Sequence, residues 1–367
     1  MVLQQPQHRK AGIVLLLVMG LLGMSIVSAQ EDATVTLIQT AEYDIGLDCP
    51  VSSTLDPSGT TLWVLMNTCG QRGYSLKAIN VADGTQVNEN DYADALTILN
   101  GVYVDLFITP IGFTPTGDIS IRYNDPDTYE SFNVIVPLAS DGEVTAQASE
   151  TYSALLAQYS EYPEYSVYSS DHTQVVASGV TGIYVVDVQS ESEIAEIPIE
   201  GGGDSVLASF SADGTHLHVI QFNVEDFDDP ATTLFIYDLA DGAVLGQYAM
   251  PSSAVWVSPD ESYAAVQLYS NDIGDLSELI VVDLETGAKS DASNLLEAPF
   301  PATTCLNSGN DIRDLNHTVS GYLNLTSLKW LPDSSGIVLT LSYGGEALSG
   351  GSLCILNYSR LRTYTVG

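Results

Sequence analysis

Four carboxylates form the densest group of possible metal ligands in the sequence: Glu225, Asp226, Asp228 and Asp229. Oxygen-rich loops of this kind can hold Ca²⁺. The run lacks the alternating spacing and the glycine of an EF-hand loop, so the pattern favours a solvated loop. Calcium binding at this loop is therefore the weaker of two interpretations.

Smaller oxygen-rich groups recur along the chain. They are Asp125-Pro126-Asp127, the pair Asp272 and Asp275, and the group Asn307, Asn310, Asp311 and Asp314. The first two occupy loops that correspond to the loop of the acidic run. The recurrence predicts polar loops on one rim, with calcium again a weak alternative to solvation.

Two histidines, His216 and His218, alternate along a predicted strand, so their side chains lie on the same face. Such a pair can chelate a metal, but the sequence shows no third ligand beside it. The pattern therefore favours packed or surface histidines, and no metal ligand is assigned.

The sequence contains none of the common catalytic motifs: no Gly-x-Ser-x-Gly, no His-Glu-x-x-His and no Gly-rich phosphate loop. Carboxylates are plentiful, and two of them could perform general acid–base catalysis. Their spacing does not identify which two would meet, so no catalytic residue is assigned.

The elements that must position these residues are clearest in 205–248. Four apolar runs, each of about 5–8 residues as in typical strands, are separated there by turn sequences. Along 215–222, Leu217 and Val219 face one way, and His218 and Ile220 face the other. Apolar residues on both faces predict a sheet that is packed between two neighbouring sheets.

This unit recurs six times. Its first turn appears as Asp56-Pro57-Ser58-Gly59, Thr114-Pro115-Thr116-Gly117, Ser169-Ser170-Asp171-His172, Ser211-Ala212-Asp213-Gly214, Ser258-Pro259-Asp260-Glu261 and Pro332-Asp333-Ser334-Ser335-Gly336. A later corner recurs at 79–84, 186–189, 237–242 and 282–287, with weaker copies at 137–142 and 356–359. The spacing is mostly near the roughly 40–50 residues of propeller repeats.

These repeats predict an all-β chain, with one β-propeller domain over 30–367 and an insertion at about 290–321. Six four-stranded blades are expected, or seven if one copy has drifted in 88–110 or 288–325. The extra strand in 33–45 is expected to pair with the last blade, because an unpaired sheet edge is a liability.

The closest repeat copy joins Val257-Ser258-Pro259-Asp260 to the corner 280–287, Ile-Val-Val-Asp-Leu-Glu-Thr-Gly. This pattern resembles the WD-repeat-like propellers of the TolB type and the YVTN-repeat propellers. The resemblance covers most of 45–367 and implies a propeller fold. It also implies the alternative of a lactonase-, hydrolase- or lyase-like enzyme with a site at the channel mouth.

Residues 1–29 resemble a signal peptide. A basic stretch that ends at Lys10 precedes an apolar run over 11–27, and Val27-Ser28-Ala29 offers small residues for cleavage. An uncleaved anchor is the alternative, although the run is at the short limit for spanning a membrane. We therefore expect a secreted, periplasmic or cell-surface protein with no membrane span after cleavage.

The chain is strongly acidic, with a formal net charge of −37. Removal of Arg9 and Lys10 with the leader makes it −39, that is, −37 minus 2. This excess argues against nucleic-acid binding, which needs a basic surface, and against anionic membranes. Solubility explains the charge more simply than cation-dependent binding does.

The four cysteines form an even set in an exported chain, which favours disulfides over zinc. Three pairings are possible, and we favour Cys49–Cys69 and Cys305–Cys354 because each then lies within one terminal repeat. Five clustered tyrosines are a candidate binding surface or ordinary strand residues: Tyr152, Tyr159, Tyr162, Tyr165 and Tyr168.

The function expected from these patterns is that of an exported binding or protein-interaction module. Its partner, whether a protein, a small molecule or a glycan, is not identified, and no cofactor is expected apart from the weak possibility of Ca²⁺. A propeller enzyme is the first alternative. A structural role in a cell envelope or matrix is the second.

Overall fold

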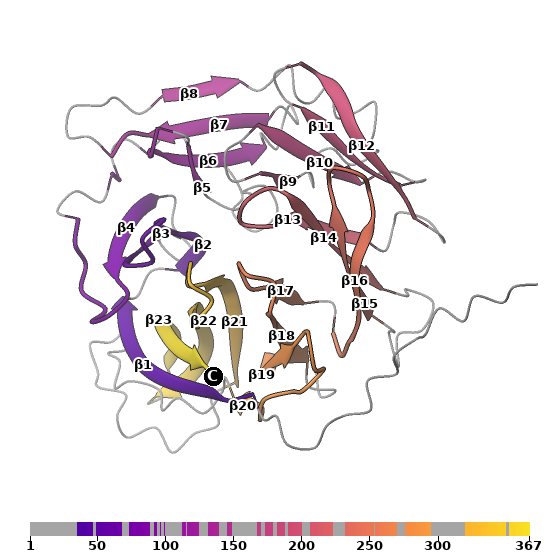
Figure 1. Ribbon diagram of the computed structural model, residues 1–367. Coiled ribbons are helices and arrows are strands. Elements are labelled where there is room, and N and C mark those ends of the chain that lie inside the picture. The colour runs from indigo at the N-terminus through magenta and orange to yellow at the C-terminus, as the bar shows by residue number, and fades with distance from the viewer. Residues whose placement is uncertain are drawn as a thin grey trace, which may run out of the picture.

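The computed structural model describes residues 35–46, 49–67, 73–88, 112–114, 116–124, 131–138, 145–148, 167–169, 173–178, 182–187, 190–199, 206–222, 232–252, 254–269, 276–294, 320–349 and 352–367, with the single positions 92, 93, 96 and 99. Within these residues the chain forms small antiparallel sheets (Figure 1). No helix in the described part is long and apolar enough to cross a membrane.

Six sheets follow one another along the chain. The first contains β2 (Cys49–Leu55), β3 (Thr61–Asn67) and β4 (Tyr74–Asn80). The second contains β5 (Gly112–Phe113), β6 (Ile119–Asn124), β7 (Ser131–Val136) and β8 (Thr145–Ala148). The third contains β9 (Val167–Tyr168), β10 (Gln174–Ser178), β11 (Gly182–Asp187) and β12 (Ser192–Pro198).

The other three sheets complete the order. The fourth contains β13 (Val206–Phe210), β14 (His216–Phe222), β15 (Thr232–Asp238) and β16 (Val244–Met250). The fifth contains β17 (Val255–Val257), β18 (Tyr263–Tyr269), β19 (Leu276–Asp283) and β20 (Ser293–Asn294). The sixth contains β21 (Ser320–Trp330), β22 (Gly336–Ser349) and β23 (Ser352–Val366), together with β1 (Leu37–Gly46).

Figure 1 shows these sheets arranged in chain order around a common centre. Sequence neighbours pair within each sheet, except that β1 joins the far end of the sixth. This arrangement of small antiparallel sheets is consistent with a β-propeller. The all-β class predicted from the sequence is confirmed.

Both faces of the strands are covered, because apolar residues occupy both alternations. In β3, Leu62 and Val64 pack toward the sixth sheet, whereas Leu65 packs toward the second. In β14, Leu217 packs toward the third sheet and Ile220 toward the fifth. The alternation predicted for 215–222 is therefore confirmed, and each such sheet depends on its neighbours for burial.

The two ends of the described chain meet in the sixth sheet. β1 pairs antiparallel with β23 from Leu37↔Val366 to Gly46↔Ser359, as expected for the extra N-terminal strand. Glu42 lies opposite the buried Arg362 and accepts a hydrogen bond of 2.6 Å from its Nε. Arg360 also pairs with Glu42, so one carboxylate supports two guanidinium groups at the closure.

The first sheet differs from the four-stranded prediction, since it has three strands among the described residues. Gln86 forms an isolated bridge with Ile79 where a fourth strand would begin. The Asn88 side chain then accepts a hydrogen bond of 2.8 Å from the Ala78 N–H and donates one of 2.9 Å to the Leu76 carbonyl. A side-chain amide thus takes the position of a peptide group at this edge of the sheet.

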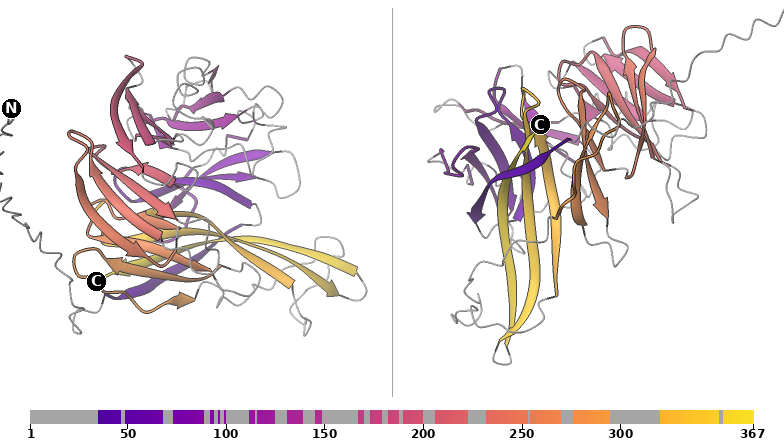
Figure 2. Two further views of the ribbon diagram at one scale, coloured as in Figure 1. Left: turned by 90° about the vertical axis from the view of Figure 1, so that its right-hand side faces the viewer. Right: turned by 60° about the horizontal axis from the view of Figure 1, so that its bottom comes forward.

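The sixth sheet is the longest. Its strands β21, β22 and β23 have 11, 14 and 15 residues, whereas β14, β15 and β16 have seven each. From Ser352 to Tyr358, β22 is the only described strand that pairs with β23, and the pairing ends at Ser349↔Ser352. Figure 2 shows this ribbon of β21–β23 extending beyond the other sheets.

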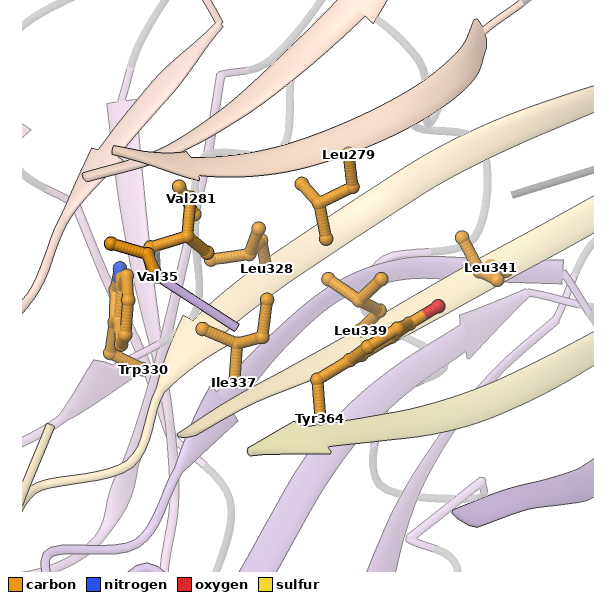
Figure 3. Packing of buried hydrophobic residues seen from close by; sticks show 10 residues of the cluster. Val35, Leu279, Val281, Leu328, Trp330, Ile337, Leu339, Leu341 and Tyr364 are labelled. Atoms are coloured by element: carbon orange, nitrogen blue, oxygen red, sulfur yellow. The ribbon is translucent and has the colours of Figure 1, made fainter. Parts of the chain in front are cut away.

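The core between the fifth and sixth sheets combines aliphatic and aromatic side chains. Leu279 and Val281 face Ile337, Leu339 and Tyr364 across it (Figure 3). Tyr263 stacks on Trp330, with ring centroids 6.4 Å apart and planes 18° apart. The Trp330 Nε1–H donates a hydrogen bond of 2.8 Å to the Trp256 carbonyl.

Candidate functional site

The first turns of the fourth and fifth repeats are held by the same set of hydrogen bonds. In the fourth sheet, the Ser211 N–H donates to the His216 carbonyl, and the Ser211 Oγ accepts from the His216 N–H, both at 2.9 Å. In the fifth sheet, Ser258 makes the same pair with Tyr263, at 2.8 and 2.9 Å. His216 and Tyr263 are therefore equivalent positions.

The fourth residue of this turn has a positive φ in five of the repeats. Its N–H donates to the carbonyl of the first residue in each case. Three repeats have glycine there: Gly59, Gly117 and Gly214, with φ of 75°, 86° and 72°. The other two have Glu261 at 58° and Ser334 at 60°. A side chain in this region costs on the order of 1–3 kcal/mol, so these two positions need a compensating contact.

Each of the two side chains reaches back to the preceding sheet. The Ser334 Oγ accepts a hydrogen bond of 3.1 Å from the Asp260 N–H. The Glu261 carboxylate meets both histidines of β14: His216 Nδ1 lies 3.0 Å from each oxygen, and His218 Nε2 lies 2.8 Å from Oε1. The backbone strain is thus offset by contacts between sheets.

The histidine–glutamate cluster lies largely out of solvent. The exposed fractions of the side chains are 28% for His216, 7% for His218 and 18% for Glu261. Burial raises the pKa of the Glu261 carboxyl, but the hydrogen bonds from His218 and His216 outweigh it and leave that pKa below its usual value. Glu261 is accordingly an ionised group held between two imidazoles.

Two further groups face this cluster. Burial raises the pKa of Tyr248 on β16, and the negative charge of Glu261 raises it further. Asp213, in the first turn of the fourth sheet, lies close enough to feel the charge of His216. Hydrogen bonds from the Thr215 hydroxyl and N–H and from Ser211 lower the pKa of Asp213 to about 2, so it stays ionised.

The geometry suits a proton-dependent contact better than a metal centre. The ring nitrogens that face Glu261 are occupied by its carboxylate, which lies between the two side chains rather than beside them. Within the residues that the structure describes, no group of three or more His, Cys, Asp or Glu side chains is arranged to hold a metal ion.

The structure brings His216 and His218 together as predicted and adds the partner that the sequence did not reveal. Glu261 is 45 residues from His216 in sequence and belongs to another sheet. One signal could have found it: in the aligned first turns, Glu261 stands where Gly59, Gly117 and Gly214 stand. A charged residue that replaces a turn glycine indicates a position under special demand.

The other predicted sites fall mostly outside the described residues. This applies to Glu225, Asp226, Asp228 and Asp229, to Asp125–Asp127, to Asp272 and Asp275, to the group 307–314, to the leader 1–29, and to the first four clustered tyrosines. Tyr168 lies in β9. The segment predicted as an insertion contains β20 and the start of β21 at its ends, and 295–319 between them are not described.

Of the four cysteines, Cys49 lies in β2 and is disulfide-bonded. Cys354 lies in β23, opposite Ala347 of β22. Cys69 and Cys305 lie outside the described residues. The pairings Cys49–Cys69 and Cys305–Cys354 therefore stay predictions.

No protein-family model matches the sequence, and no curated protein matches it. Among solved structures, the chain is similar to hydrazine synthase from Kuenenia stuttgartiensis, with 14% identity and a TM-score of 0.40, over 84% of this chain and 80% of that one. It is also similar to TolB from Acinetobacter baumannii, with 13% identity and a TM-score of 0.40, over 85% of this chain and 62% of that one. Similarity at this level identifies no function.

Proposed function

We propose that this chain is an exported six-bladed β-propeller that acts as a binding module. The six sheets are the six blades, with β1 completing the last of them. Neighbouring blades share apolar cores, for example between the fourth and fifth sheets and between the fifth and sixth. A ring built in this way is a rigid support on which loops and extensions are free to carry recognition.

The observation that supports a binding role best is the ribbon of β21–β23. A blade needs strands of about seven residues, as in the fourth sheet, and β22 and β23 have about twice that length. The additional length lies beyond the ring (Figure 2) and contributes nothing to closing it. Because the fold does not need this additional surface, the surface is available to bind a protein, glycan or small-molecule partner.

A ribbon-shortened variant tests this role. Tyr343 lies directly opposite Tyr358, so residues 344–357 can be replaced by Asn-Gly, a two-residue hairpin turn. Because Cys354 is removed, the variant also carries Cys305→Ser. The matched control keeps the full ribbon and carries Cys305→Ser with Cys354→Ser.

Labelled wild-type, shortened and control proteins are then applied to glycan and peptide arrays. We expect ligands that bind the wild type and the control but not the shortened variant, which keeps its circular dichroism spectrum. Ligands retained by the shortened variant would place binding elsewhere on the ring. Turnover of a lactone, ester or glycoside that a single carboxylate substitution abolishes would favour the enzyme alternative.

Export has its own test. Cleavage after Ala29 predicts an intact mass that starts at Gln30, and an unreduced protein without titratable thiols. A mature protein that retains residues 11–27 would instead indicate a membrane anchor.

A further inference from the structure

We propose that the contact of Glu261 with His216 and His218 is a pH-sensitive latch between the fourth and fifth sheets. Its parts come from two sheets, since the histidines lie on β14 and Glu261 lies in the turn between β17 and β18. The rest of the described seam, the interface between these two sheets, is mainly an apolar core that includes Ile220 and Val266, with Tyr248 packed against it. The Glu261 contact adds a charged interaction to this seam.

The latch is closed while Glu261 is ionised. Its carboxylate then accepts hydrogen bonds from both histidines, at 2.8–3.0 Å. Hydrogen bonds to a charged acceptor are stronger than bonds between neutral groups.

The latch opens in stronger acid. The pKa of Glu261 is lower in the folded chain than its usual value of 4.5. The stability that its ionised form contributes is therefore complete above about pH 4.5 and is lost as the pH falls through the lower, folded value. A neutral Glu261 no longer carries the charge that strengthens both hydrogen bonds, one of which joins it to the buried His218.

Asp213, Tyr248 and Asp238 are the titratable groups beside this cluster, and Asp238 lies opposite His216 on β15. Hydrogen bonds from Thr215 and Ser211 lower the pKa of Asp213 to about 2. Tyr248 has its pKa raised and remains a neutral phenol throughout acid.

Hydrogen exchange of the intact protein, read by mass spectrometry between pH 3 and 7, tests the proposal. After correction for the intrinsic exchange rate, peptides over 206–222 and 254–269 are expected to be well protected while Glu261 is ionised. Their protection should fall about tenfold below the titration of Glu261, the size expected for losing hydrogen bonds to a charged group. Peptides over 61–80 of the first sheet serve as the internal reference.

Two variants decide the result. Glu261→Gln keeps the shape and removes the charge, so at neutral pH its seam should show the low protection that the wild type shows only in acid. Glu285→Gln removes a charge from an exposed turn of the same sheet and should behave as the wild type. If Glu261→Gln does not fold, His216→Gln serves instead and should reduce the difference in protection between neutral pH and acid.

A seam whose pH dependence is the same in the wild type and in Glu261→Gln would overturn the proposal. So would a loss of protection in acid that is equal in the reference peptides, since that reports unfolding of the whole chain. Neither outcome bears on the ribbon, so the latch and the binding role fail independently.

Discussion

The two seams on either side of the fifth sheet use equivalent positions in opposite ways. The residue that follows the first turn is His216 in the fourth sheet and Tyr263 in the fifth. His216 meets a carboxylate of the next sheet, whereas Tyr263 stacks on Trp330 of the next sheet. The same backbone thus supports a charged, hydrogen-bonded contact at one seam and an aromatic contact at the next.

The largest expected effect comes from breaking the aromatic seam. Trp330→Ala removes a side chain that is 8% exposed and leaves a cavity against Tyr263. We expect a loss of about 3–5 kcal/mol in the free energy of unfolding, measured by urea denaturation. Trp330→Phe keeps an aromatic ring and removes the hydrogen bond to Trp256, so it should lose only about 1 kcal/mol from that bond. Equal losses in the two variants would contradict this account.

Breaking the polar seam should cost less. His218→Ala removes one of the two donors to Glu261, and we expect a loss of about 1.5–3 kcal/mol at pH 6. His216→Ala should cost less than His218→Ala, since His216 is 28% exposed and His218 is 7% exposed. The same urea titrations check the order, and a reversed order would mean that burial does not set the strength of these bonds.

The positive φ of Glu261 gives a smaller and more specific effect. Glu261→Gly and Glu261→Ala both remove the carboxylate, but only glycine adopts this φ freely. We expect the Gly variant to be about 1 kcal/mol more stable than the Ala variant, the opposite of their order in a strand or helix. Ser334→Gly and Ser334→Ala should repeat this order at the next first turn.

The smallest expected effect comes from copying the polar contact to another seam. Gln174 occupies the position of His216 in the third sheet, and its Oε1 is buried without a hydrogen-bond partner in the structure. Gly214 occupies the position of Glu261, and a Cβ there would meet no atom within 4 Å. Gln174→His with Gly214→Glu should therefore show a favourable coupling of about 0.5 kcal/mol in a double-mutant cycle. A coupling of zero would show that the seams differ in more than these two residues.

The local structure was predictable because it is coded over a few residues. Ser211 and Asp213 bond within their own turn, and Asp238 binds the N–H of Ala240 two residues on. Such turns need no distant partner, so the repeat pattern located the first turn and the corner of the fourth sheet from the sequence. The pairing of the N-terminal strand with the last repeat was also predictable. Each of the two leaves an unpaired sheet edge, and pairing them covers both edges.

Only the histidine part of the candidate site could be predicted from the sequence. The alternation of His216 and His218 placed them on one face, because a strand has a period of two residues. Their partner could not be inferred in the same way, since Glu261 binds from another sheet across a seam. The role of Asn88 was also missed, because strand patterns do not encode a side chain that binds the edge of a sheet.

The sequence by itself determined the all-β class, the six turn-and-strand repeats and the faces of their strands, since each of these depends on hydrogen bonds and alternation within a few residues. The tertiary structure alone decided which repeats touch and through which side chains: Glu261 with His216 and His218, Trp330 with Tyr263, Glu42 with Arg362. Those contacts join residues tens to hundreds of positions apart. They exist only once each sheet has covered the apolar face of its neighbour.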